Sequence, residues 1–268
     1  QSQVVVPRDR MLSRCIRRAK ERLEQGEYTQ AIRFLDEVLA ADQEDFFILT
    51  GKEEDEYAGL KETARQIIRS LPTEGRTIYQ ATYGPVAKRE LKKARTTGDL
   101  DAVRRIAYRY FYTDAGYEAA LLLAQNQADL GRHLSAALLY EELRNTEEAA
   151  RRFEPQLSLL AAEAWIAAGD AEKAEKVLQT LAQGGYRSVT IAGQEIRLDS
   201  LNSAPLDWLG RVVGSPVTLA LRSYSQWLTF RGNSQRNGHA EGGLPHMRQR
   251  WTVRLLTHPD LEDFFETL

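Results

Sequence analysis

Few side chains in this sequence stand at spacings that suit a catalytic or metal-binding site. The four histidines are His133, His239, His246 and His258, and none lies three to five residues from another histidine or from the single cysteine. Structural zinc sites usually take their ligands from such close pairs. We therefore expect no metal. Cys15 lies on the apolar side of an expected helix, and we interpret it as a buried small side chain.

Other common catalytic patterns are also missing from the sequence. No serine stands in a nucleophile-elbow pattern, and no glycine-rich phosphate loop precedes a Lys-Ser or Lys-Thr pair. The acidic run 53–56 is interpreted as a solvated loop, with weak binding of a divalent ion as the alternative, because no apolar pocket raises a carboxyl pKa there. We predict a chain that is not an enzyme and has no cofactor.

An aromatic cluster next to arginines is the clearest candidate for binding. It consists of Tyr108, Tyr110, Phe111, Tyr112 and Tyr117 beside Arg104, Arg105 and Arg109. One interpretation is packing between helices, and the other is a groove that grips an extended peptide. Stacked bases need the same ingredients, but the net charge of −2 argues against nucleic acid. The candidate partner-binding residues are Arg104, Arg105, Tyr108, Arg109 and Tyr112.

A repeated phrase, in which a glycine is followed five positions later by a small residue, predicts the architecture. It begins at Gly26, Gly98, Gly131 and Gly169, and the last three glycines are 33 and 38 residues apart, a spacing typical of helical repeats. Each glycine is expected to end one helix in a left-handed turn. Each small residue should allow two helices to approach closely, and the small residues are Ala31, Val103, Ala136 and Ala174.

The apolar periodicity places helices along most of the chain. We expect helices at 8–25, 31–39, 53–70, 86–96, 99–110, 113–130, 134–143, 155–168 and 171–181, with a loop at 41–57. Residues 188–198 alternate as a β-hairpin does, 219–231 could form a strand, and 259–268 could begin a helix. The predicted fold is mostly α, with a helical-repeat domain at 1–184. A β-hairpin and an extended linker follow at 185–268.

A motif near the C-terminus resembles the entry into a quinoprotein-like, PQQ-binding-like β-propeller. The matching residues are Trp227, Arg231, Gly232, Arg236, Gly238, Pro245 and Trp251. Together with a helical N-terminal region, this motif is similar to the large exported propeller proteins of planctomycete-type bacteria. The resemblance implies that propeller blades follow Leu268, and that any quinone or metal site lies in those blades. It therefore assigns no catalytic residue to this chain.

The helical pairs also resemble tetratricopeptide repeats, although degenerate ones. Gly26, Ala31 and Leu35 fit the pattern, whereas Val103 replaces the expected alanine and the proline expected after each unit is missing. The resemblance implies an α-solenoid of TPR-like helical hairpins. Such arrays present surfaces to partners.

These observations favour a non-catalytic helical-repeat scaffold that binds a protein or peptide, or the downstream propeller of the same chain. Such a scaffold would form the N-terminal part of a larger exported, periplasmic propeller protein. The alternative is a supporting domain of a quinone-dependent oxidoreductase whose catalytic propeller is not in this chain. The chain opens without methionine, as a mature exported protein or a truncated chain would. No apolar run is long enough to span a membrane.

Overall fold

The computed structural model describes residues 9–41, 47–49, 57–191, 194–198, 201 and 204–213, and this part of the chain is mostly helical. It contains eleven α-helices and two antiparallel strand pairs. The first helices are α1 (Arg10–Glu24), α2 (Tyr28–Ala40), α3 (Leu60–Arg69), α4 (Thr73–Thr97) and α5 (Leu100–Arg109). Then follow α6 (Asp114–Asp129), α7 (His133–Arg144), α8 (Glu147–Phe153), α9 (Gln156–Ala167), α10 (Ala171–Gln183) and α11 (Pro205–Val213).

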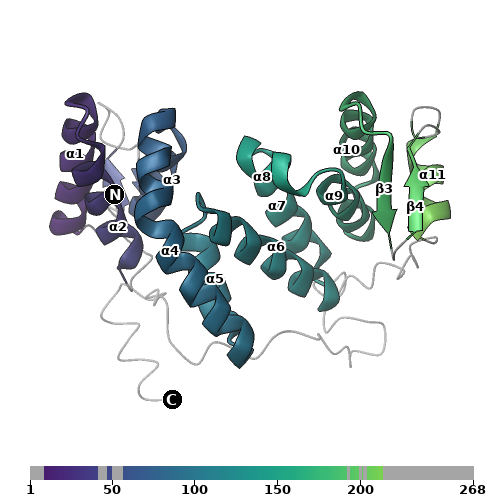
Figure 1. Ribbon diagram of the computed structural model, residues 1–268, viewed down its shortest axis with the longest axis horizontal. Coiled ribbons are helices and arrows are strands. Elements are labelled where there is room, and N and C mark those ends of the chain that lie inside the picture. The colour runs from purple at the N-terminus through teal and green to yellow at the C-terminus, as the bar shows by residue number, and fades with distance from the viewer. Residues whose placement is uncertain are drawn as a thin grey trace, which may run out of the picture. The chain divides into compact units, whose positions relative to one another are not determined.

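Most helices pack against their neighbours in sequence. The closest partners are α1 with α2, α5 with α6, α6 with α7, α7 with α9, and α9 with α10 (Figure 1). The strands β3 (Ser188–Ile191) and β4 (Gln194–Arg197) form the hairpin predicted from the alternating pattern. Val189, Leu198, Leu201 and Trp208 belong to the same buried cluster as α5–α10, so the core continues past the predicted boundary at 184.

The repeated phrase folds as its residues predict. Gly26, Gly98, Gly131 and Gly169 have φ values of +75°, +68°, +72° and +87°, the left-handed region that glycine occupies at low cost. The residues five positions later are buried: Ala31, Ala136 and Ala174 are 0% exposed and Val103 is 4% exposed. Asp99, Thr113 and Asp170 accept hydrogen bonds from backbone N–H groups in the first turns of α5, α6 and α10.

The zero exposure of Ala136 and Ala174 leads to a stability prediction. Replacing either with Leu should overpack the helix contact and lower the free energy of unfolding by about 1–3 kcal/mol. Ser135→Leu is the control, because Ser135 is exposed on the same helix as Ala136 and should change stability little. Chemical denaturation measures all three variants. Unchanged midpoints for both alanine variants would show that the repeat alignment is wrong.

The segment from residue 41 to Pro85 differs from the sequence prediction. The expected loop contains β1 (Phe47–Leu49), which pairs antiparallel with β2 (Tyr57–Gly59). Aromatic and β-branched residues favour such pairing. The helix expected at 53–70 begins at Leu60, after Gly59 in an extended conformation. The helix expected at 86–96 begins at Thr73 and contains Pro85 in its interior.

Tertiary packing explains why α4 continues through Pro85. Proline removes one backbone hydrogen bond from a helix, but α4 is anchored on both sides of this point. Tyr79, 2% exposed, packs in the cluster of α1–α3, and Ala87 and Leu91 pack in the cluster of α5–α11. The Tyr79 hydroxyl also donates a hydrogen bond to the carbonyl oxygen of Arg109, at 3.1 Å. Thus α4 contributes to both clusters.

Several other predictions have a mixed outcome. Helices α8 and α11 were not expected from the sequence, since α8 has only seven residues and the tail after Leu201 has little apolar periodicity. Cys15 is partly buried, not fully buried as predicted, and its thiol donates a hydrogen bond to Glu37 Oε2 at 3.4 Å. The strand and helix predicted at 219–231 and 259–268, the acidic run and the propeller-like motif lie outside the described residues.

Candidate functional site

The aromatic–arginine cluster does not form one continuous surface. Arg104 and Arg105 are exposed on α5, and Arg104 forms an ion pair with Asp101 at 2.5 Å, one turn away on the same helix. Tyr110, Phe111 and Tyr117 are 4%, 2% and 5% exposed, as the packing interpretation requires. The five candidate residues therefore differ in their surroundings.

Arg109 contacts α2. Its Nε and Nη2 atoms each donate a hydrogen bond to a carboxylate oxygen of Asp36 at 2.8 Å, which is the bidentate geometry of a strong arginine–carboxylate pair. Hydrogen bonding to Asp36 raises the pKa of Arg109. The guanidinium also lies 5.0 Å from the ring centroid of Tyr110. Arg109 thus joins α2 to α5 within the fold.

Tyr108 and Tyr112 lie close to α3. The Arg65 guanidinium stands 4.7 Å from the ring centroid of Tyr108 and 5.2 Å from that of Phe111, and Arg65 also pairs with Glu142 of α7. Tyr112 packs edge-on against Phe111 with 5.0 Å between ring centroids. Burial is the main reason that the pKa of Tyr112 is raised. Of the five candidates, Tyr112 alone lines a groove beside α4 and α8.

A groove of about 810 Å³, here called the α4–α8 groove, lies beside α4 and α8. Its lining includes the aromatic side chains of Tyr79, Tyr112 and Tyr117 and several charged side chains. Gln80 exchanges hydrogen bonds of 3.2 and 3.3 Å with Asp114, and Arg76 pairs with Glu148. The lining residues include Arg76, Thr77, Tyr112, Tyr117, Glu148 and Arg151.

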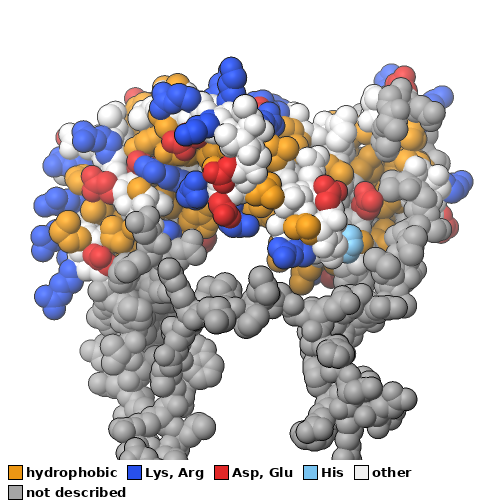
Figure 2. Space-filling model, turned by 90° about the horizontal axis from the view of Figure 1, so that it is seen from below, with side chains coloured by type: hydrophobic (Ala, Val, Ile, Leu, Met, Phe, Trp, Pro, Cys, Tyr) orange, Lys and Arg blue, Asp and Glu red, His pale blue; other side chains and the backbone are white. Residues whose placement is uncertain are grey.

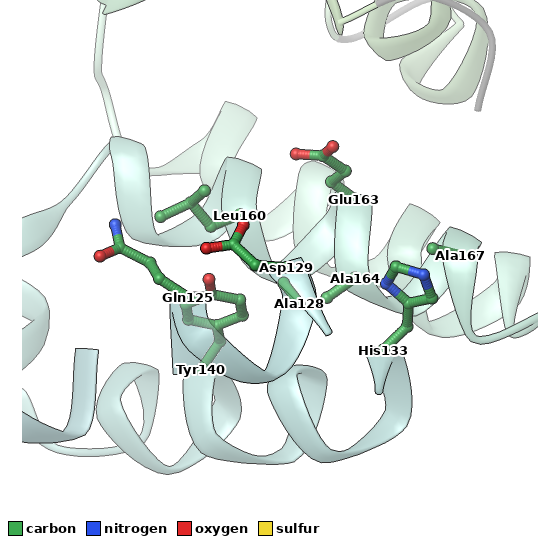
Figure 3. Close-up of a pocket in the computed structure, with 9 residues that line it drawn as sticks. All are labelled: Gln125, Ala128, Asp129, His133, Tyr140, Leu160, Glu163, Ala164 and Ala167. Atoms are coloured by element: carbon green, nitrogen blue, oxygen red, sulfur yellow. The ribbon is translucent and has the colours of Figure 1, made fainter. Parts of the chain in front are cut away.

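A second cavity of about 420 Å³, here called the acidic cavity, lies between α6, α7 and α9 (Figure 3). Asp129 and Gln125 come from α6, His133 and Tyr140 from α7, and Glu163 from α9. Ala128, Leu160, Ala164 and Ala167 form its apolar walls. In Figure 2 a histidine lies near acidic side chains on the face seen from below. The spacing of the histidines led us to expect only that His133 binds no metal, and nothing in the sequence indicates this cavity.

The described residues lack two further features, a metal-ligand cluster and a membrane-spanning helix. Among the described residues, no group of three histidine, cysteine or acidic side chains is arranged to hold a metal ion. None of the described helices is long and apolar enough to cross a membrane. Both cavities offer hydrogen-bonding and charged groups next to apolar walls, an arrangement that suits binding.

No protein-family model matches the chain, and neither a curated protein nor a solved structure with significant similarity was found.

Proposed function

We propose that this region is a non-catalytic helical-repeat scaffold that binds a protein partner, with its helical pairs forming a TPR-like α-solenoid. The observation that carries the proposal is the pairing of left-handed glycines with buried residues, three alanines and a valine, at a constant spacing of five. That combination sets each helix closely against the next. Repeat arrays built in this way use their surfaces for recognition.

The α4–α8 groove is the proposed docking site. Tyr112, which is partly exposed, supplies aromatic surface, and Arg76 and Arg151 supply charge, the residue types that dominate binding energy at interfaces. Arg151 is exposed, and its ion pair with Glu147 lies on the surface of α8. Such an exposed pair contributes little to stability, so Arg151 can exchange Glu147 for a partner group at low cost.

The proposal also includes the larger protein to which this region would belong. Residues 227–251 resemble the entry into a PQQ-binding-like propeller, so the scaffold would precede such a propeller in an exported protein. Its partner would be either another protein or that propeller. The role as a support for a quinone-dependent oxidoreductase depends on the same motif. Sequence upstream of Gln1 and downstream of Leu268 tests both, through a signal peptide and the residues facing the propeller channel.

A matched pair of threonine variants tests docking in the groove. Thr77 and Thr96 are both exposed on α4, and each hydroxyl donates a 2.9 Å hydrogen bond to the carbonyl oxygen four residues earlier. Only Thr77 lines the groove. Thr77→Arg should therefore block a partner by bulk and charge, whereas Thr96→Arg should not.

The measurement is quantitative pull-down from native extract with wild type and both variants. We expect a specific partner to be retained by Thr96→Arg and reduced at least about tenfold by Thr77→Arg, which corresponds to about 1.4 kcal/mol. Equal recovery by both variants would exclude the groove as the docking site. The absence of any specific partner would contradict the docking function itself.

A further inference from the structure

The two carboxylates of the acidic cavity differ from all their acidic neighbours. From α6 through α9, each of the other acidic side chains forms an ion pair with an arginine: Asp114, Glu118, Glu141, Glu142, Glu147, Glu148 and Glu154. Asp129 and Glu163 have no cationic partner among the described residues. Both line one cavity, although they come from different helices.

A buried tyrosine at the base of this cavity provides an independent indication of a ligand. Tyr140 is only 1% exposed, and in Figure 3 its hydroxyl points toward the cavity on the side of Asp129. No described residue forms a hydrogen bond with that hydroxyl. Burial, together with Glu163 and Asp129, raises the pKa of Tyr140, so the hydroxyl stays protonated. Because no buried side-chain oxygen or nitrogen of the described residues lacks a partner, this hydroxyl opens onto the cavity, where it can accept a hydrogen bond from a ligand.

We propose that the acidic cavity binds the side chain of an arginine or lysine from an extended partner peptide. This inference rests on the docking function proposed above and specifies the chemistry of the partner. The cation would pair with Asp129 and Glu163, and the Tyr140 hydroxyl would complete its hydrogen bonds as an acceptor. Arginine fits best because its planar guanidinium contacts several oxygens at once.

The apolar walls explain why the ligand is a long side chain. Ala128, Ala164, Ala167 and Leu160 line the cavity, and the methylene stem of arginine or lysine packs on such surface while its charge stays among polar groups. The volume of about 420 Å³ is large enough for one such side chain. A small inorganic cation would leave these walls without a contact.

Exposed leucines that are neighbours in sequence of two cavity residues favour a peptide over a free amine. Leu130 and Leu134 follow Asp129 and His133 directly in the chain, and they are 57% and 56% exposed. A peptide whose basic residue enters the cavity has neighbouring residues that can cover these leucines, whereas a free amine has none.

The test uses the full chain and a fluorescein-labelled peptide that carries two arginines among alanines and leucines. A matched peptide has citrulline in place of each arginine, which keeps the shape and removes the charge. The protein variants are Asp129→Asn/Glu163→Gln, which alters two exposed rim residues, and Tyr140→Phe, which removes only the hydroxyl. Glu21→Gln/Glu24→Gln is the control, because it changes the net charge equally on exposed positions of α1.

We expect fluorescence anisotropy to show binding of the arginine peptide that weakens at least about tenfold in Asp129→Asn/Glu163→Gln and about threefold in Tyr140→Phe. The α1 control should bind as wild type does, and the citrulline peptide should bind at least about tenfold more weakly. Equal affinity for both peptides, or equal affinity of wild type and the rim variant, would overturn the proposal. So would light scattering in which wild type self-associates and the rim variant does not, because a second copy would then be the occupant.

The Thr77→Arg variant separates this proposal from the docking function. If that variant loses the extract partner while the rim variant keeps it and neither peptide binds, the scaffold function stands and the cationic site is wrong. If no extract partner exists but the arginine peptide binds through Asp129 and Glu163, the cavity is confirmed and groove docking is wrong.

Discussion

Gly116→Ala is expected to lower the free energy of unfolding by about 3 kcal/mol or more, because a side chain has no room at this position. An added Cβ would lie 1.8 Å from the carbonyl oxygen of Tyr110 and 2.7 Å from that of Phe111. These are backbone atoms, held by the turn in which both the backbone N–H and the hydroxyl of Thr113 donate to Tyr110 O, at 3.0 and 2.8 Å. The turn cannot move aside without disrupting the Thr113 cap of α6.

Gly210→Ala is the matched control for this prediction. Gly210 lies within α11, and an added Cβ would meet no atom within 4 Å. Alanine has the higher helix propensity, so this change should raise stability by about 0.5–1 kcal/mol. Urea denaturation followed by circular dichroism measures both. A Gly116→Ala protein as stable as wild type would mean that the Tyr110–Thr113 turn is not packed against α6 as described.

The repeat elements could be predicted from the sequence because their signals are local. A glycine at the end of a helix and a small residue five positions later act within a few residues, as Gly131 and Ala136 illustrate. The helix through Pro85 could not be predicted in the same way. Its continuation depends on Tyr79, Ala87 and Leu91 packing into two clusters, and these contacts involve residues distant in sequence.

The candidate cavities were beyond sequence reasoning for a related reason. Asp129, Tyr140 and Glu163 come from three helices, and nothing in their spacing indicates that they share one cavity. The sequence does not show that Asp129 and Glu163 lack an arginine partner, because the ion pairs of the neighbouring carboxylates are known only from the fold. The aromatic–arginine cluster was recognisable as a set, but only the fold separates Arg109, paired across helices, from Arg105, exposed on α5.

Arg109→Glu is the second variant expected to have a large effect, with a loss of about 3 kcal/mol in the free energy of unfolding. The Asp36 side chain is 19% exposed and would lose both hydrogen bonds from the guanidinium. The carboxylate of the new glutamate would also face that of Asp36, and the two charges would repel each other. Arg105→Glu is the control, four residues earlier on the same helix, and should stay within about 0.5 kcal/mol of wild type because Arg105 is exposed.

A charge exchange shows whether the loss comes from this pair. Asp36→Arg combined with Arg109→Glu restores opposite charges and should recover part of the stability lost in Arg109→Glu. Thermal unfolding of wild type, Asp36→Arg, Arg109→Glu and the double variant gives the coupling between the two positions. If Arg109→Glu were as stable as Arg105→Glu, the contact between α2 and α5 would contribute nothing, and Arg109 would again be a candidate for binding a partner. With the expected result, Arg104 and Arg105 remain the arginines of α5 that can be tested for docking without disturbing the fold.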